Sequence, residues 1–322
     1  MYKMEFYDKN TIQNVDINYP DIYFTPKYGT ACEYSDNAIW ELCKYKDLIY
    51  VYLKRPVEFQ GKIYYDLITP YGYSGYYYKK KDTFEEFLPL FREKAIEKNY
   101  VTEVLRQNPY ININITCYDV ILSRKIYSIN LEKLNDNSYL KATSKSNRRM
   151  IRNAIKNNLE FKILEYNNNN FNNFKVVYDL TMNNLNSTKY YYFNKDYYNC
   201  LTNCFIACVY LEKKICASCI IFKYNKLLHY HIGGSLLEYR NYGCNNFLHY
   251  NVIKYGIQNN YKLYVLGGGL KEGDSLSEFK RKLSNKEFQY TIYKNIVNKE
   301  IYKKLKNKLC KDKKINYFPE YR

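Results

Sequence analysis

Residues 227–283 constrain the fold of this chain most, because strand, turn and helix patterns follow one another there at short intervals. Residues 227–234 alternate as a half-buried strand does, which puts Leu228, Tyr230 and Ile232 on one face. Two glycines end this run and permit a sharp bend or a close backbone approach. The run therefore predicts a strand that leads directly into a turn.

The second half of the same stretch predicts a helix, a strand and another helix. Apolar residues between 247 and 255 share one arc of a helix. Residues 264–266 are apolar and predict a short buried strand that runs into three consecutive glycines. Residues 275–278, Ser-Leu-Ser-Glu, have the pattern of a capping box and predict the start of the last helix.

Similar patterns predict elements along the rest of the chain. Strands are expected at residues 48–53, 63–68, 101–106, 117–122, 125–131, 205–211 and 215–224. Helices are expected at residues 83–99, 145–156, 174–185, 196–204 and 298–310. The asparagine-rich residues 167–173 predict a loop. This mixture indicates an α/β or α+β fold.

The composition limits the classes of partner. The net charge of +18 favours anionic partners such as RNA, nucleotide phosphates, coenzyme A or an anionic membrane surface, although a solvated basic surface explains it equally well. The 10 cysteines lack the spacing of a zinc site and indicate free thiols in a reducing compartment. Neither a signal peptide nor a transmembrane span is apparent, so we expect a soluble cytoplasmic protein without a bound metal.

Several segments in order resemble one family. The stretch above contains HIGGS, EYRNYG, NNFL, GGG and DSLSEFKRKL, and before it come YFTPKYG, YYDLITPYGYSG, LRQNPY and SKSNRRMIRNAIKN. Together with the terminal YFPEYR, these segments resemble the Fem-type aminoacyltransferases of the GNAT acyltransferase superfamily. The resemblance implies two tandem GNAT-like lobes, each a mixed, mostly antiparallel sheet flanked by helices. No long helical insertion is present, so the chain is similar to the members that lack a coiled-coil arm.

A polar break at residues 135–138 marks the expected boundary between the lobes. Residues 1–137 would form the N-terminal lobe, and residues 138–322 would form the acyl-transfer lobe. The lysine-rich residues from about 300 to 322 are expected to pack back on the first lobe.

The resemblance points to Lys280 as the principal catalytic residue. It follows Phe279 in a pair that matches the Phe-Lys pair at the active centre of the family. A cationic Lys280 could stabilise a developing oxyanion or neutralise donor phosphate, and Phe279 would line the acyl channel. Asp274 is a candidate general base, as are Glu238 and His231, although a position before a helix also suits a cap.

A second group of residues is expected to bind the phosphates of the donor. Arg240 and Gly243 resemble the pyrophosphate loop of GNAT enzymes that use coenzyme A, but Asn245 stands where a second glycine is usual. Arg149 and Arg152 lie on one stripe of a predicted helix with two lysines, a run of like charge that an anion would relieve. The solvated face of a surface helix is the other explanation for this stripe.

A tyrosine-rich turn completes the candidate site. Residues 69–75 contain a proline and two glycines, so they predict a turn that carries Tyr71 and Tyr73. The turn would either face a substrate or serve as an ordinary loop packed by aromatic rings. No Ser-His-Asp spacing and no metal-binding motif is present, which favours direct attack by an amine.

These observations predict an acyltransferase that modifies an amine of a cell-envelope precursor, either a peptidoglycan peptide or an amino-sugar glycan intermediate. By resemblance the co-substrate is aminoacyl-tRNA or acyl-coenzyme A, with no tightly bound cofactor. We expect no stable DNA binding, and contact with a membrane only at its periphery. The alternative is a non-catalytic RNA-binding or scaffold protein that retains the fold.

Overall fold

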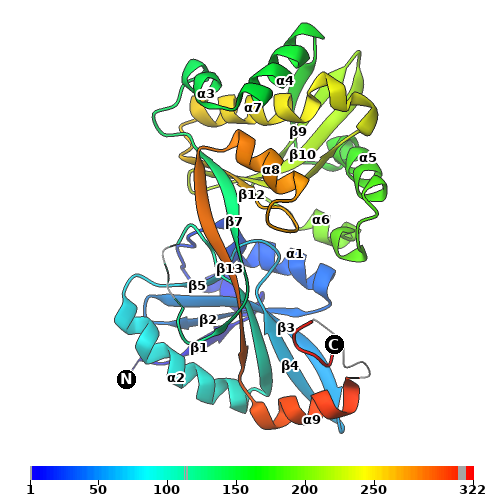
Figure 1. Ribbon diagram of the computed structural model, residues 1–322. Coiled ribbons are helices and arrows are strands. Elements are labelled where there is room, and N and C mark those ends of the chain that lie inside the picture. Colours follow the sequence, from blue (N-terminus) through cyan, green and yellow to red (C-terminus); the bar gives the residue numbers. More distant parts are fainter. Residues whose placement is uncertain (1, 112, 114, 311–316) are drawn as a thin grey trace. The chain divides into compact units, whose positions relative to one another are not determined.

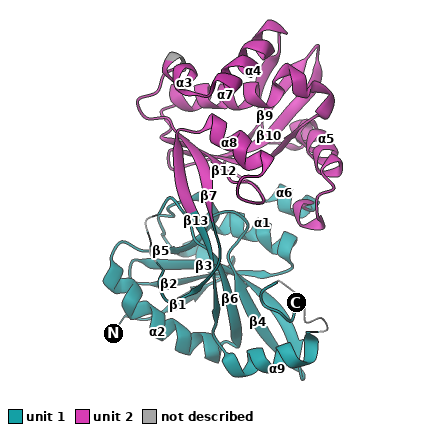
Figure 2. Ribbon diagram, in the orientation of Figure 1, with its two compact units in different colours: residues 1–123, 194–200, 290–322 teal, residues 124–193, 201–289 magenta. Residues whose placement is uncertain are grey.

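The computed structural model describes residues 2–111, 113, 115–310 and 317–322 (Figure 1). The chain divides into two compact units, coloured separately in Figure 2. Unit 1 comprises residues 1–123, 194–200 and 290–322, and unit 2 comprises residues 124–193 and 201–289. These units differ from the expected lobes, because the boundary lies at 123/124 rather than 137/138 and unit 1 also takes residues 194–200 and the chain from residue 290.

Unit 1 is built on a sheet with the strand order β1-β2-β3-β4-β6-β13, and β5 pairs with β3. Neighbouring strands run antiparallel except for the parallel pair of β4 and β6. The strands are β1 (Glu5–Tyr7), β2 (Ile39–Tyr45), β3 (Leu48–Phe59), β4 (Lys62–Ile68), β5 (Gly75–Tyr77), β6 (Tyr100–Arg106) and the second part of β13 (Lys286–Ile296). The helices are α1 (Pro26–Asp36), α2 (Lys81–Glu97), α6 (Lys195–Asn199) and α9 (Lys299–Leu309), with the short η1 (Thr11–Asn14) and η2 (Ile22–Phe24).

Unit 2 has a sheet with the order β7-β12-β11-β10-β9-β8, in which β11 and β12 alone are parallel. Helix α7 covers one face of this sheet and α5 packs on β9, β10 and β11 from the other. The strands are β7 (Asp119–Asn130), β8 (Glu160–Glu165), β9 (Cys204–Leu211), β10 (Lys214–Tyr224), β11 (Leu227–Ser235) and β12 (Leu263–Gly267). The helices are α3 (Asp136–Ala142), α4 (Lys145–Lys156), α5 (Asn168–Asn184), α7 (Cys244–Gln258) and α8 (Ser275–Leu283), with the short η3 (Lys189–Tyr191) and η4 (Leu237–Tyr242). The predicted class, a mixed α/β fold with mostly antiparallel sheets flanked by helices, is confirmed.

Parts of the chain differ locally from the sequence predictions. The helix expected at residues 196–204 is shorter, because α6 ends at Asn199 and Cys204 begins β9. Residues 117–131, expected as two strands, contain the single strand β7. The asparagine-rich residues 167–173, expected as a loop, begin α5, because the side chain of Asn167 accepts a hydrogen bond from the Asn170 N–H and caps the helix. Helix α1 was not expected, although Thr25 caps it and a proline occupies its first turn.

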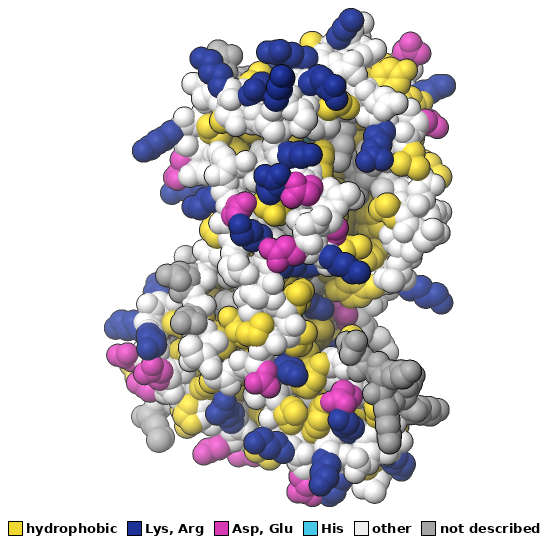
Figure 3. Space-filling view, in the orientation of Figure 1, with side chains coloured by type: hydrophobic (Ala, Val, Ile, Leu, Met, Phe, Trp, Pro, Cys, Tyr) yellow, Lys and Arg dark blue, Asp and Glu magenta, His cyan; other side chains and the backbone are white. Residues whose placement is uncertain are grey.

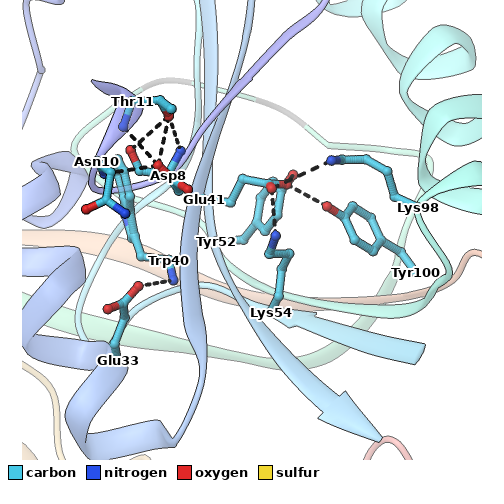
Figure 4. Close-up of polar contacts among 10 residues, drawn as sticks. All are labelled: Asp8, Asn10, Thr11, Glu33, Trp40, Glu41, Tyr52, Lys54, Lys98 and Tyr100. Carbon is cyan, nitrogen blue, oxygen red and sulfur yellow. Dashed lines mark hydrogen bonds and ion pairs between the residues drawn. The ribbon is translucent and has the colours of Figure 1, made fainter. Parts of the chain in front are cut away.

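Tyrosine hydroxyls and buried carboxylates meet in the core of unit 1. Glu41 on β2 is buried and accepts hydrogen bonds from the hydroxyls of Tyr52 and Tyr100, both at 2.5 Å (Figure 4). The ammonium groups of Lys54 and Lys98 lie 2.7 and 3.7 Å from the same carboxylate. One carboxylate thus gives acceptors to two buried phenols and compensates two cations.

A second buried carboxylate fixes the end of the chain. Asp66 on β4 accepts hydrogen bonds from the hydroxyl of Tyr321 at 2.5 Å and from Nε of Arg322 at 2.6 Å. The hydroxyl of Thr102 on β6 donates to the same carboxylate at 2.6 Å. The C-terminal residues are therefore held on unit 1 by the buried carboxylate of Asp66.

We predict that Glu41→Ala lowers the free energy of unfolding by about 3 kcal/mol, because it leaves two buried phenols and the half-buried ammonium of Lys54 without their shared acceptor. Glu5→Ala is the control, since the side chain of Glu5 is 44% exposed and lies 3.9 Å from Lys44, and its effect should stay within about 0.5 kcal/mol. Thermal and urea denaturation of both variants measure the difference. Equal losses in the two variants would contradict a central role for the buried carboxylate.

Candidate functional site

The two parallel strands of unit 2 separate along their length. Strands β11 and β12 are paired from Leu227 with Leu263 to His229 with Val265. Beyond these pairs β11 continues against β10 as far as Ser235, while β12 continues against β7. Beyond His229 and Val265 the two strands are no longer paired, and this unpaired region at their carboxyl ends is called the opening below. The carboxyl ends of parallel strands are where ligands commonly bind.

A bulge in β11 changes which side chains face this opening. Ile221 on β10 pairs with Tyr230, but its neighbour Ile220 pairs with Ile232, so His231 is the extra residue. A Cβ atom at Gly233 would lie 2.8 Å from the hydroxyl of Tyr230, so these two residues share a face. The regular alternation expected for Leu228, Tyr230 and Ile232 therefore stops at the bulge.

Lys280 of α8 projects into this region. Its side chain is buried, 7% exposed, and its ammonium donates a hydrogen bond to the carbonyl of Gly268 at 2.8 Å. The ammonium also lies 5.6 Å from the centroid of the Tyr230 ring. Burial, helped by the charge of Arg124 and opposed by Asp274, lowers the pKa of Lys280 to about 7.

The three glycines between β12 and α8 form the bend that receives this ammonium. Gly267 has a φ of 76°, in the left-handed region that favours glycine. A Cβ atom at Gly269 would lie 2.0 Å from Oδ1 of Asp274, so a side chain there would displace the carboxylate. The absence of side chains lets the bend wrap around Asp274 and present the carbonyl of Gly268 to Lys280.

The carboxylate of Asp274 stabilises the bend by accepting backbone hydrogen bonds. It accepts hydrogen bonds from the backbone N–H groups of Leu270 at 2.7 Å, Lys271 at 2.8 Å and Ser277 at 2.7 Å. Burial opposes ionisation, but these donors outweigh it and lower the pKa of Asp274. These contacts favour the role of a helix cap over that of a general base.

The expected capping box at residues 275–278 was wrong by one position. The N-cap of α8 is Asp274, whereas Glu278 forms an ion pair with Arg281 at 2.7 Å. An aspartate preceding a serine-rich first turn competes for the same backbone donors, which the sequence pattern did not separate.

Aromatic side chains surround the ammonium. His249 of α7 is buried, and its Nδ1 lies 2.9 Å from the hydroxyl of Tyr264 on β12. Burial, together with the charge of Lys280, lowers the pKa of His249 to about 3, so the imidazole is neutral at pH 7. The ring of Phe279 lies 5.7 Å from His249, and that of Tyr230 lies 5.0 Å from it. The ammonium of Lys280 therefore lies beside side chains that are neutral at pH 7.

The surface of unit 2 is hollowed between α8 and α5 in Figure 3, and apolar side chains line the hollow. Around the carboxyl end of β11, Gly234 faces α5, because a Cβ atom there would lie 2.2 Å from Oγ1 of Thr181. The opening between β11 and β12 therefore lies beside a partly apolar surface that a ligand can approach.

The residues expected to bind donor phosphate lie on neighbouring elements. Asn153 of α4 donates to the carbonyl of Asn241 at 2.7 Å, and Asn246 donates to the side chain of Asn147 at 2.8 Å. These contacts join α4, which carries Arg149 and Arg152, to the turn with Arg240, Gly243 and Asn245. The three arginines are exposed and Asn245 is half-buried.

Backbone conformation and helix packing both require a glycine at position 243. Its φ is 80°, and a Cβ atom would lie 2.4 Å from the carbonyl oxygen of Met150 on α4. Close packing of two helices therefore requires glycine at this position, whether or not a phosphate binds there.

Tyr71 and Tyr73 belong to unit 1. The carbonyl of Tyr71 accepts a hydrogen bond from the hydroxyl of Tyr28 at 2.7 Å. The ring of Tyr73 lies edge-on to those of Tyr23 at 5.7 Å and Tyr290 at 5.2 Å. Both tyrosines thus take part in packing, and their contact with a substrate stays a prediction.

Sequence reasoning missed Arg124, Tyr230, His249 and Tyr264 as neighbours of Lys280. These residues come from β7, β11, α7 and β12, which only the strand pairings bring together. Within the described residues, no three His, Cys, Asp or Glu side chains converge as a metal site would require. None of the helices in the described part of the chain has the length and apolar character needed to span a membrane.

Comparisons with known proteins identify a domain family and similar folds. Residues 145–281 match the model of the acetyltransferase (GNAT) domain family. Among solved structures, FemX is 13% identical with a TM-score of 0.68, and the match covers 88% of this chain and 94% of FemX. L-PGS from Bacillus licheniformis is 13% identical with a TM-score of 0.58 over 84% of this chain and 87% of that protein.

A conserved protein of unknown function from Bacteroides thetaiotaomicron is 12% identical with a TM-score of 0.54, over 83% of this chain and 89% of that protein. A search of curated proteins found no match. The domain match favours an enzyme over the non-catalytic alternative. The chain has a Fem-like GNAT acyltransferase fold, and it is an acyltransferase.

Proposed function

We propose that this acyltransferase transfers an acyl or aminoacyl group from aminoacyl-tRNA or acyl-coenzyme A to an amine of a cell-envelope precursor. The observation that carries the proposal is the buried ammonium of Lys280 on the Gly268 carbonyl, beside the opening between β11 and β12. The fold resemblance to FemX, and to the structures of L-PGS and of a lysylphosphatidylglycerol synthetase domain from Agrobacterium fabrum at a TM-score of 0.50, supports an envelope acceptor.

The proposed reaction is direct attack of the acceptor amine on the carbonyl carbon of the donor. A C–N bond forms, the carbonyl π electrons move to oxygen, and their return breaks the ester or thioester bond to the donor. The attacking nitrogen loses a proton, and the leaving oxygen or sulfur takes one up. The developing oxyanion needs a donor placed where water is excluded, and Lys280 can supply one.

The surroundings of Lys280 suit that role. One backbone carbonyl accepts a hydrogen bond from the ammonium, and an aromatic face lies near it, so the ammonium retains donors for an oxyanion. Neutral His249 and the ring of Phe279 keep the region apolar, which strengthens the attraction between cation and oxyanion. Lys280 therefore acts as an electrostatic stabiliser in the proposed mechanism.

The donor is expected to approach across α4 and the start of α7. Both donor types carry phosphates, and Arg149 and Arg152 on α4 and Arg240 on η4, just before α7, are exposed cations, as are Lys145 and Lys156 of α4. The amine of the acceptor would come from the opposite direction to the carbonyl carbon. For the tyrosine-rich turn of unit 1, a role of Tyr71 and Tyr73 in facing a substrate stays a prediction.

The direct test is mass spectrometry of envelope-precursor amines after incubation with the protein and either charged tRNA or acyl-coenzyme A. A mass gain on one acceptor identifies both substrates. If the donor is charged tRNA, its binding should weaken about 10³-fold or more between 50 and 200 mM salt when six or more phosphates are contacted. The absence of a mass gain with every pair of donor and acceptor would refute the proposal.

We predict that Lys280→Met lowers kcat about 10²- to 10³-fold, because the oxyanion loses its charged donor. Lys282→Met is the matched control, since Lys282 lies on the exposed face of the same helix and should leave kcat within about twofold. Steady-state kinetics of the two variants provide the comparison. Equal activity of Lys280→Met and the wild type would remove Lys280 from the mechanism.

We also predict that Lys280→Met stabilises the protein at and below pH 7. The folded state holds Lys280 with a pKa near 7, and the unfolded state returns it to its ordinary value of 10.5. Below pH 7 both states are charged and the folded state bears the cost of burial. Between pH 7 and 10.5 only the unfolded state keeps the proton, so the wild type gains stability as the pH rises.

Melting temperatures of wild type and Lys280→Met from pH 6 to pH 10 check this prediction. The advantage of the variant should be largest at pH 6 and should shrink as the pH rises. A variant that melts below the wild type at pH 6 would show that the ammonium stabilises the fold, contrary to the prediction.

A further inference from the structure

Two cations hold the segment that follows β12 at carbonyls two residues apart. Lys280 donates to the carbonyl of Gly268, and Nη1 of Arg124 donates to the carbonyl of Leu270 at 2.7 Å. Nε of Arg124 lies 3.9 Å from the position of a Cβ atom on Gly268, so the guanidinium runs along the same bend. Strand β7 and helix α8 thus each supply one positive charge to the carbonyls of residues 268–270.

The charges around this pair do not cancel. Asp274 is the nearby carboxylate, but its oxygens accept the N–H groups of Leu270, Lys271 and Ser277. The other titratable groups that face the ammonium are the phenol of Tyr230 from β11 and the imidazole of His249 from α7. The burial of Tyr230 raises the pKa of its phenol, so both groups are neutral near pH 7.

A like-charged pair of this kind favours an arriving negative charge. Arg124 and Lys280 repel each other in the free protein, which is one reason why the pKa of Lys280 is low. An oxyanion that forms beside them relieves the repulsion as well as attracting each cation. This electrostatic stabilisation acts mainly on the transition state, because the carbonyl oxygen of the bound donor is neutral.

We propose that Arg124 is a positioning residue for the acyl-transfer step, which fixes the bend beneath the Lys280 ammonium and adds a second positive charge toward the oxyanion. This inference rests on the acyl-transfer role proposed for Lys280. Arg124 itself need not touch the substrate, since it acts through the bend and through its charge. Its effect should therefore fall on kcat rather than on KM.

Three variants separate the two contributions. Arg124→Met removes both charge and hydrogen bond, and should lower kcat about tenfold with little change in KM. Arg124→Lys retains the charge but lacks the planar fork, and should recover most of the lost kcat. Lys125→Met is the control, because exposed Lys125 pairs with Glu287 at 2.8 Å and should leave kcat unchanged.

The titration of Lys280 gives a readout that does not require activity. Carbon-13 NMR of the lysine side chains, with Lys280→Met for assignment, follows the protonation of this residue. Arg124→Met should raise the pKa of Lys280 by about one unit, because one nearby like charge is lost. Arg124→Lys should leave the midpoint near that of the wild type.

The Arg124 variants test the role of Arg124, whereas Lys280→Met tests the catalytic role of Lys280. A lower kcat with an upward shift of the Lys280 titration in Arg124→Met supports the role of Arg124. An unchanged kcat or an unchanged titration in that variant overturns it, and if Arg124→Met does not fold, a Lys280 pKa near 10 in Arg124→Lys overturns it instead. Full activity of Lys280→Met, by contrast, would refute the catalytic role of Lys280 whatever Arg124 does.

Discussion

The burial of one ammonium group is the constraint on which the site in unit 2 depends. Moving a charge out of water is costly, and a single carbonyl with an aromatic face offsets only part of that cost for Lys280. The remainder appears as the lowered pKa. The separation of β11 from β12, the glycine bend and the cap at Asp274 all help to hold this group where it is. A buried group whose pKa is strongly shifted is a candidate functional residue, because such shifts are concentrated at functional sites.

The core of unit 1 must provide hydrogen-bond acceptors for buried tyrosines, because the chain contains 42 of them. Buried phenols need hydrogen-bond acceptors, and strands of the sheet supply them as carboxylates. Glu41 and Asp66 are examples, and Glu103 on β6 accepts from Tyr50 at 3.0 Å and Tyr118 at 2.7 Å. Burial raises the pKa of Glu103. A mean hydropathy of −0.59 is therefore compatible with an extensive core, because polar atoms inside it satisfy one another.

The sequence predicted elements whose signals are local and missed arrangements that depend on distant partners. Alternation predicted β11, strand and turn signals predicted β9 and β10, and a resemblance rather than a physical signal singled out Lys280. The bulge at His231 was not predictable, because it depends on the register between β10 and β11. Arg124 and His249 lie far from Lys280 in the sequence, and no pattern within either segment indicates that they meet. The asparagine-rich start of α5 shows how capping can override composition.

The structure also shows that Gly243 does not distinguish between the two possible donors. The spacing of Arg240 and Gly243 resembles a pyrophosphate loop, but the contact of Gly243 with Met150 requires a glycine there for helix packing alone. The glycine therefore no longer favours coenzyme A over tRNA. What distinguishes the two donors is the number of phosphates that the protein neutralises, since a short pyrophosphate needs few cations and an RNA backbone needs many. Arg149 and Arg152 are three residues apart on α4, about 4.5 Å along its axis, so a single pyrophosphate or an RNA backbone could engage both. The dependence of donor binding on salt, which reports the number of phosphates neutralised, is therefore the property that separates the two donors.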